Sequence, residues 1–136
     1  MNPKEIRLAL EARQIELRPP ATGGVLAEFE RICKVTLCSN FREIYSEFNG
    51  YVSHDPKSYF TIWPLETIGK NIETSLHPNK PNDIAFGDFL FHSDIIATDI
   101  SKNDAIVCLI FENKTLAPSL LEFFERVVSG HYDYFT

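Results

Sequence analysis

The chain is poor in the residues on which several classes of small protein depend. It has three cysteines, Cys33, Cys38 and Cys108, and no two of them form a Cys-x-x-Cys pair. An odd number of cysteines without that spacing argues against a zinc ribbon, a redox motif and a disulfide framework. We therefore expect three reduced thiols, buried or half-buried, because an unmodified cysteine packs as a small hydrophobe.

Long apolar runs and an excess of basic residues are missing too. No segment approaches the roughly 18 consecutive apolar residues of a membrane helix. Thirteen Lys and Arg stand against nineteen Asp and Glu, a formal net charge of −6, which does not suit a nucleic-acid backbone. Met1–Leu10 carries Lys4, Glu5 and Arg7 in place of a signal peptide's apolar stretch. We expect a cytoplasmic protein that binds neither membranes nor nucleic acid directly.

Catalytic motifs are missing as well. The chain has no Gly-x-Ser-x-Gly nucleophile elbow, no P-loop and no Gly-x-Gly-x-x-Gly sequence. Two alternatives stay open: His92 with Asp94 as a metal site or acid–base pair, and Cys38 as a nucleophile activated at a helix start. A small hydrolase or metal enzyme is thus the least favoured function. We expect a non-enzymatic protein with no cofactor and no bound metal.

The chain does contain enough apolar material for one folded domain. Its 136 residues are 44% apolar and include eleven Phe and five Tyr, as in ordinary globular domains. Residues 1–136 are therefore predicted to form a single domain. Capping signals and helical spacing of apolar residues predict helices with defined starts and ends. The starts are Asn2-Pro3, Thr22, Ser39, Pro64 and Pro118, and the clearest ends are Asn49-Gly50 and Gly130.

Between the third helix and the last, the pattern becomes that of strands. The predicted strands are Ser58–Trp63, Ile84–Phe86, Phe89–His92, Ile95–Ile100 and Ala105–Phe111, with Gly87-Asp88 interrupting the second and third. The last is uniformly apolar, which predicts a central strand buried on both faces. His77–Asp83 is predicted to be a loop, and the tail His131–Thr136 to dock on the domain. This order predicts an α+β fold: a mainly antiparallel sheet, with the N-terminal helices and the C-terminal helix packed largely on one face.

Aspartates gather in the strand region. Five of them lie within twenty-two residues and are opposed only by Lys102; they are Asp83, Asp88, Asp94, Asp99 and Asp104. One interpretation is ordinary turn and edge chemistry. The functional interpretation is an acidic rim that meets a basic partner, where charge affects association rate and specificity more than affinity. The candidate partner-binding residues are Asp55, Asp83, Asp88 and Asp94.

Blocks of sequence follow one another in an order typical of a known family. The opening comprises Leu26-x-x-Phe29, Val35-x-Leu37 and Phe41-x-x-x-Tyr45-x-x-Phe48-Asn49-Gly50. The later blocks are Ile62-Trp63-Pro64-Leu65-Glu66-x-Ile68, Ile84-Ala85-Phe86-Gly87-Asp88 and Leu116-Ala117-Pro118-Ser119-Leu120-x-Glu122-Phe123. In this order they resemble the SUKH superfamily, and the resemblance covers residues 25–128, most of the chain.

The resemblance implies a fold and a function. The fold is an α+β domain with a curved sheet and helices at both ends of the chain. The bacterial members it points to are immunity proteins, which bind and block a cognate toxin domain, often a nuclease, of polymorphic or contact-dependent systems. Other members are interaction scaffolds that regulate cell-wall synthesis, and the family has no catalytic residues to carry over. We therefore expect an immunity protein with a basic toxin domain as partner; a regulatory scaffold is the alternative.

Two positions depart from the family pattern. Cys38-Ser39 stands where the family usually starts a helix with a Leu-Pro type sequence. Phe89-Leu90-Phe91 follows Gly87-Asp88 where the family usually continues with a glycine-rich turn. If that turn shapes the partner surface, the departure implies an unusual partner.

Overall fold

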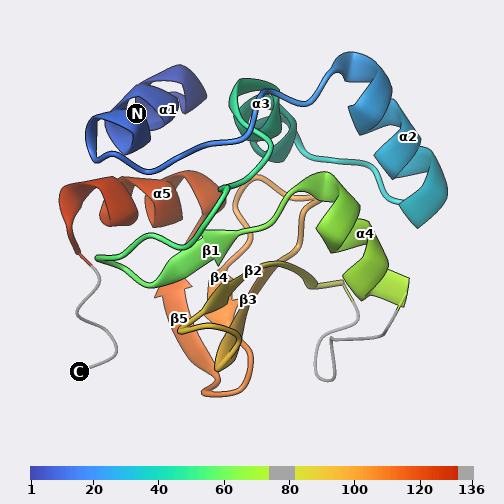
Figure 1. Ribbon diagram of the computed structural model, residues 1–136. Helices are drawn as coiled ribbons and strands as arrows, with labels where there is room; N and C mark the ends of the chain where they lie inside the picture. Colours follow the sequence, from blue (N-terminus) through green and yellow to red (C-terminus); the bar gives the residue numbers. More distant parts are fainter. Residues whose placement is uncertain (74–81, 132–136) are drawn as a thin grey trace.

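The computed structural model describes residues 1–73 and 82–131, and these form one small α+β domain. Five helices accompany a five-stranded antiparallel sheet that does not close on itself. Figure 1 shows the helices gathered on one side of the sheet, as the sequence predicts. The predicted loop His77–Asp83 and the predicted docking of the tail lie largely outside the described residues.

The first helix, α1 (Pro3–Ala12), begins where the sequence predicts. The side chain of Asn2 accepts the Glu5 backbone N–H, and the Glu5 side chain accepts that of Asn2, which completes a capping box. Ile6 and Leu10 share one buried face of the helix. That face packs α1 against the third and fifth helices.

The next two helices differ in how well their starts are predicted. Thr22 caps α2 (Gly23–Cys33), as expected, by accepting the Val25 backbone N–H. The third helix, α3 (Ser39–Glu47), is capped by Cys38 and not by Ser39. The Cys38 Sγ accepts the Phe41 backbone N–H at 3.4 Å. The prediction of Ser39 as the cap is wrong by one position.

The sheet is a simple meander in the order β1-β2-β3-β4-β5. Its strands are β1 (Phe60–Ile62), β2 (Ile84–Phe89), β3 (Asp94–Thr98), β4 (Val107–Leu109) and β5 (Lys114–Ala117). Because each strand is antiparallel to the next, the β2–β3 turn and the β4–β5 turn lie at the same end of the sheet. The start of β1 lies at that end too, since Phe60 is opposite Phe89.

Two strand predictions are wrong. Gly87 and Asp88 lie inside β2 and do not interrupt it, although the register shifts by a bulge between Ala85 and Gly87. A Cβ on Gly87 would lie 2.6 Å from the Thr61 carbonyl oxygen, so glycine permits the close β1–β2 approach. Of Ala105–Phe111, only β4 pairs as a strand; it is next to the sheet edge, and Phe111 is exposed.

Two further helices complete the fold. Helix α4 (Leu65–Glu73) packs on β2 and against α2. Helix α5 (Leu120–Ser129) is capped by Ser119 and ends at Gly130, whose φ is +79°; the glycine end agrees with the sequence prediction. Phe123 of α5 packs edge-on or tilted against Phe60 and Phe86 of the sheet, which joins helix and sheet in one aromatic core.

Both edge strands of the sheet accept hydrogen bonds from other parts of the chain. The Arg126 Nη1 donates to the Leu116 carbonyl oxygen of β5 at 2.5 Å. At the other edge, the backbone N–H groups of Tyr51 and Asp55 donate to the carbonyl oxygens of Ile62 and Phe60 in β1. Edge groups that are already bonded are less open to a strand from another chain.

Candidate functional site

Large apolar side chains are exposed at the end of the sheet that carries both turns. Phe91 in the β2–β3 turn is 68% exposed, and Phe111 in the β4–β5 turn is 61% exposed. Tyr59, before β1, and Leu90, beside Phe91, are also exposed. We call these four residues the aromatic end. Exposed apolar groups gathered on one part of a small domain are typical of an interaction surface.

The β2–β3 turn has an uncommon backbone. Leu90, Phe91 and His92 are consecutive and have φ angles of +51°, +50° and +71°. Residues with a Cβ rarely adopt this left-handed region, and such strain concentrates at functional sites. The turn is held by the Leu90 N–H, which donates to the Tyr59 carbonyl oxygen at 3.0 Å, and by edge contact between the Phe91 and His54 rings. The Phe91 side chain is therefore presented in a defined position.

Asp88 fixes the base of the same turn. It is 3% exposed, and its Oδ2 accepts the Trp63 indole N–H at 2.6 Å. Its Oδ1 accepts the His92 backbone N–H at 3.4 Å, and Oδ2 lies 3.5 Å from His92 Nδ1. The His92 ring itself is largely exposed. Asp88 thus supports the aromatic end from beneath.

Asp94 fixes the β4–β5 turn. It is 3% exposed, and its two carboxylate oxygens accept three backbone N–H groups. These belong to Ile95 at 2.7 Å, Phe111 at 2.8 Å and Glu112 at 3.1 Å. A carboxylate of β3 therefore holds the turn that presents Phe111.

Three of the four candidate partner-binding aspartates are buried, which corrects the expectation that they face a partner. Besides Asp88 and Asp94, Asp55 is 1% exposed; it accepts the Ser58 hydroxyl at 2.6 Å and pairs with Arg13 at 3.2 Å. Asp83 is half-buried, with its Oδ2 4.0 Å from the Cys108 Sγ. A carboxylate is tolerated in the interior only when it is hydrogen-bonded or paired with a cation. Asp55, Asp88 and Asp94 meet this condition, so these three predicted contact residues stabilise the fold.

His92 and Asp94 do not form the alternative acid–base or metal pair. The contacts of His92 run to Asp88, and those of Asp94 run to backbone N–H groups. In the described ranges 1–73 and 82–131, no group of three or more His, Cys, Asp or Glu side chains is arranged to hold a metal ion.

The surroundings of Cys38 do not favour an activated thiolate. Burial raises the pKa of its thiol above the ordinary value, and backbone N–H groups of Phe41 and Asn40 offset this only in part. None of the three cysteines is in a disulfide, and all are half-buried. Cys38 therefore caps the helix through its sulfur, and burial acts against ionisation of its thiol.

This leads to a prediction on thiol reactivity. At pH 8 Cys38 should react with iodoacetamide at least about fivefold more slowly than a cysteine in an unstructured peptide, because a raised pKa leaves less thiolate. Mass spectrometry of tryptic fragments follows the rate at each cysteine. A Cys38→Ser variant identifies the Cys38 contribution. Alkylation of Cys38 as fast as the peptide would contradict the prediction.

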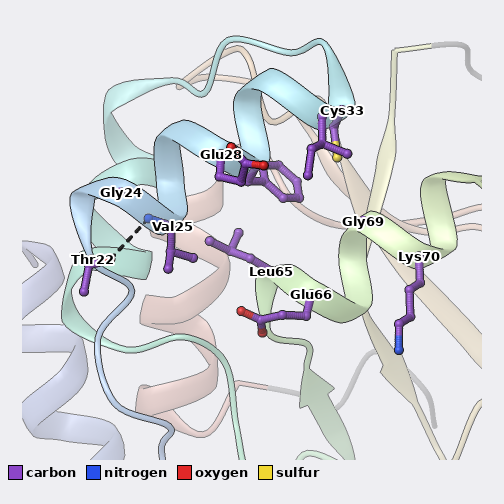
Figure 2. Close-up of a pocket in the computed structure, with 11 residues that line it drawn as sticks. Thr22, Gly24, Val25, Glu28, Cys33, Leu65, Glu66, Gly69 and Lys70 are labelled. Atoms are coloured by element: carbon purple, nitrogen blue, oxygen red, sulfur yellow. Dashed lines mark hydrogen bonds between the residues drawn. The ribbon is translucent and has the colours of Figure 1, made fainter.

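A second apolar surface lies between α2 and α4. A groove of about 530 Å³ separates the two helices, within the usual size of ligand sites. Figure 2 shows Val25 of α2 and Leu65 of α4 between the helices, with Lys70 directed away from α2. Ile32, which also lines the groove, is 55% exposed. Charges of both signs stand at the rim, among them Glu28, which Arg31 pairs at 2.6 Å.

Sequence reasoning noted Phe89-Leu90-Phe91 as a departure from the family pattern but did not connect it with Tyr59 and Phe111 as one candidate surface. The signal was present in Phe89-Leu90-Phe91, where apolar residues run on into a turn. Their exposure could not be read from the sequence, because Phe89 of the same run is buried.

Compared with family models and with curated proteins, the chain matches none. Among residues 1–73 and 82–131, no helix combines the length and the hydropathy needed to cross a bilayer.

Proposed function

We propose that this chain is a non-enzymatic binding protein: a cytoplasmic immunity protein of the SUKH type that neutralises a toxin domain. The observation that carries the proposal is the aromatic end, where Phe91 and Phe111 are exposed on turns held by the buried carboxylates of Asp88 and Asp94. Rigid aromatic anchors favour affinity, because little conformational entropy is lost when they bind.

Charge supports a basic partner. The net charge of the chain is −6. Several of its arginines are already engaged by its own carboxylates, as in the Arg7–Glu47 and Arg42–Glu30 pairs. The negative field that remains would accelerate encounter with a basic nuclease domain, and this acceleration falls with ionic strength.

Neutralisation by occupation needs no chemistry from this chain. A standard interface buries about 800 Å² on each partner, a surface that the aromatic end and its surroundings can contribute to. Burial of each phenyl ring would supply about 1.5–3 kcal/mol. The toxin would be blocked because its active site, or the path to it, is covered.

The test is coexpression with the toxin domain encoded beside the gene of this chain. We expect the wild-type chain to restore growth. The double variant Phe91→Ala/Phe111→Ala should bind the domain about a hundredfold more weakly, as for two anchor residues, and lose the rescue. Ile32→Ala in the groove is the matched control and should rescue fully. A neighbouring toxin that the chain neither binds nor neutralises would refute the proposal.

A regulatory scaffold is the second candidate, and the α2–α4 groove favours it. A scaffold needs two surfaces that bind at once, and the groove is a separate apolar concavity with the exposed Ile32 at its margin. The two candidates differ in one measurement. For an immunity protein Ile32→Ala leaves growth rescue unchanged, whereas a scaffold loses one of two partners in an affinity capture.

A further inference from the structure

We propose that the aromatic end binds an arginine-bearing segment of a protein partner. This inference specifies the partner of the proposed function, and it rests on that proposal because it assumes that the partner is a basic protein. It is carried by the combination of exposed phenyl rings and buried, hydrogen-bonded carboxylates at one end of the sheet.

The rings supply the first part of the recognition. Phe91 and Phe111 are the most exposed large apolar residues in the described part of the chain. Their turns are fixed by hydrogen bonds to Asp88 and Asp94, and both residues are largely exposed, although the Phe91 ring also contacts His54. The face of a phenyl ring attracts a cation by its quadrupole, and guanidinium groups use this contact more often than ammonium groups do.

The carboxylates supply the second part. Among the described residues, neither Asp88 nor Asp94 pairs with a lysine or an arginine; their partners are the Trp63 indole, His92 and backbone N–H groups. Two negative charges therefore lie beneath the aromatic end and are only weakly screened by solvent.

The surrounding charges do not cancel this field. Exposed Glu112 adds to it at the β4–β5 turn. Lys102 and Lys114 are the basic residues nearest in sequence to these turns, and no ion pair among the described residues joins either lysine to Asp88 or Asp94. A cation placed on the rings would be attracted both by the π faces and by the charge below them.

Arginine fits this surface better than lysine. Its guanidinium group is planar and weakly hydrated, so it stacks on a ring at a small desolvation cost. The ammonium group of lysine is compact and strongly hydrated, and loses more water on contact with a phenyl face. The surface should therefore prefer arginine at equal peptide charge.

The experiment uses short synthetic peptides in which arginine, lysine or glutamate alternates with glycine. Each is titrated into the full chain, labelled with ¹⁵N, and amide shifts are followed by NMR. We expect the arginine peptide to shift the amides of residues 90–93 and 110–113, and to bind about threefold more tightly than the lysine peptide, as cation–π contacts at exposed sites predict. The glutamate peptide should not shift these amides.

Two variants separate the rings from general charge. The Phe91→Leu/Phe111→Leu variant keeps apolar side chains at exposed positions and should bind the arginine peptide about tenfold more weakly; its amide spectrum confirms the fold. Ile32→Ala should bind the peptide unchanged. Any of three results would overturn the inference: amide shifts outside the two turns, equal affinity for the arginine and lysine peptides, or unchanged affinity in the leucine variant. If the toxin still binds through Phe91, the proposed function survives that result.

Discussion

Replacing Gly50 with alanine is expected to lower the free energy of unfolding by about 4 kcal/mol, among the largest effects of a single substitution. Gly50 has a φ of +82°, a conformation that strains any residue with a Cβ. A Cβ there would also lie 2.6 Å from the Trp63 carbonyl carbon and 2.7 Å from the Ile62 carbonyl oxygen. These are backbone atoms, so they cannot move aside as a flexible side chain would.

The loss of stability would extend beyond Gly50, because the close contact of Gly50 with the Ile62–Pro64 backbone lies among hydrogen bonds that join separate parts of the fold. The Tyr51 N–H beside Gly50 donates to the Ile62 carbonyl oxygen at 2.7 Å, and the Gly50 carbonyl accepts the Arg18 N–H at 3.0 Å. The buried Tyr45 hydroxyl donates to the Trp63 carbonyl oxygen at 2.7 Å. A shift that relieved the clash would therefore weaken hydrogen bonds to β1 and to α3.

Urea unfolding followed by circular dichroism measures the effect. Gly23→Ala is the matched control, since a Cβ at Gly23 meets no atom within 4 Å. That variant should be neutral or slightly stabilised, because alanine favours helix. Equal stability of the two variants would show that the close approach of Gly50 to the Trp63-Pro64 backbone is not a constraint on the fold.

Replacing Asp94 with alanine should lower the free energy of unfolding by about 3 kcal/mol, because a buried charged acceptor is removed and its donors are stranded. The N–H groups of Ile95, Phe111 and Glu112 would lose their shared acceptor. Asp94→Asn keeps one oxygen acceptor and should lose about half as much. Asp104→Ala, at an exposed position, is the matched control and should lie within about 0.5 kcal/mol of wild type.

The loss should also be local. Hydrogen exchange at the amides of Phe111 and Glu112 should accelerate in Asp94→Ala more than exchange in α1, because the β4–β5 turn is freed before the domain unfolds. In Asp104→Ala the pattern should match wild type. If Asp94→Ala left both the stability and the exchange of these two amides unchanged, the carboxylate would not be what holds the turn.

The helix ends were predictable because their signals are local. Asn2, Thr22 and Gly130 act within a few residues of themselves, through caps whose geometry depends little on the rest of the chain. Even the error at α3 is small: Cys38 takes the role predicted for Ser39, since its sulfur reaches the Phe41 N–H.

Burial in the strand region was less predictable because it depends on distant neighbours. The run Ala105–Phe111 is uniformly apolar, yet Val107 and Leu109 are buried while Ile106 and Phe111 are exposed. The run crosses from a loop through a short strand into a turn. A pattern of apolar residues cannot tell a strand buried on both faces from a short strand whose flanks face solvent.

The prediction that the aspartates are exposed was wrong for a related reason. A carboxylate in a turn is usually exposed, and sequence alone gives no sign that Asp94 of β3 accepts N–H groups of the next hairpin, at Phe111 and Glu112. Asp88 likewise finds the Trp63 indole twenty-five positions away in the chain. The first partnership exists because the meander brings the two turns to one end of the sheet, and the second because β1 pairs with β2.

The amino-acid sequence by itself determined the α+β class, the positions of the helices and the net acidity. Periodicity and helix caps are properties of short segments, and net charge is a sum over all residues of the chain. Tertiary structure alone decided which carboxylates are buried and which phenyl rings remain in solvent. That division is physical: exposure and hydrogen-bond partnership depend on which distant segments the antiparallel strands place side by side.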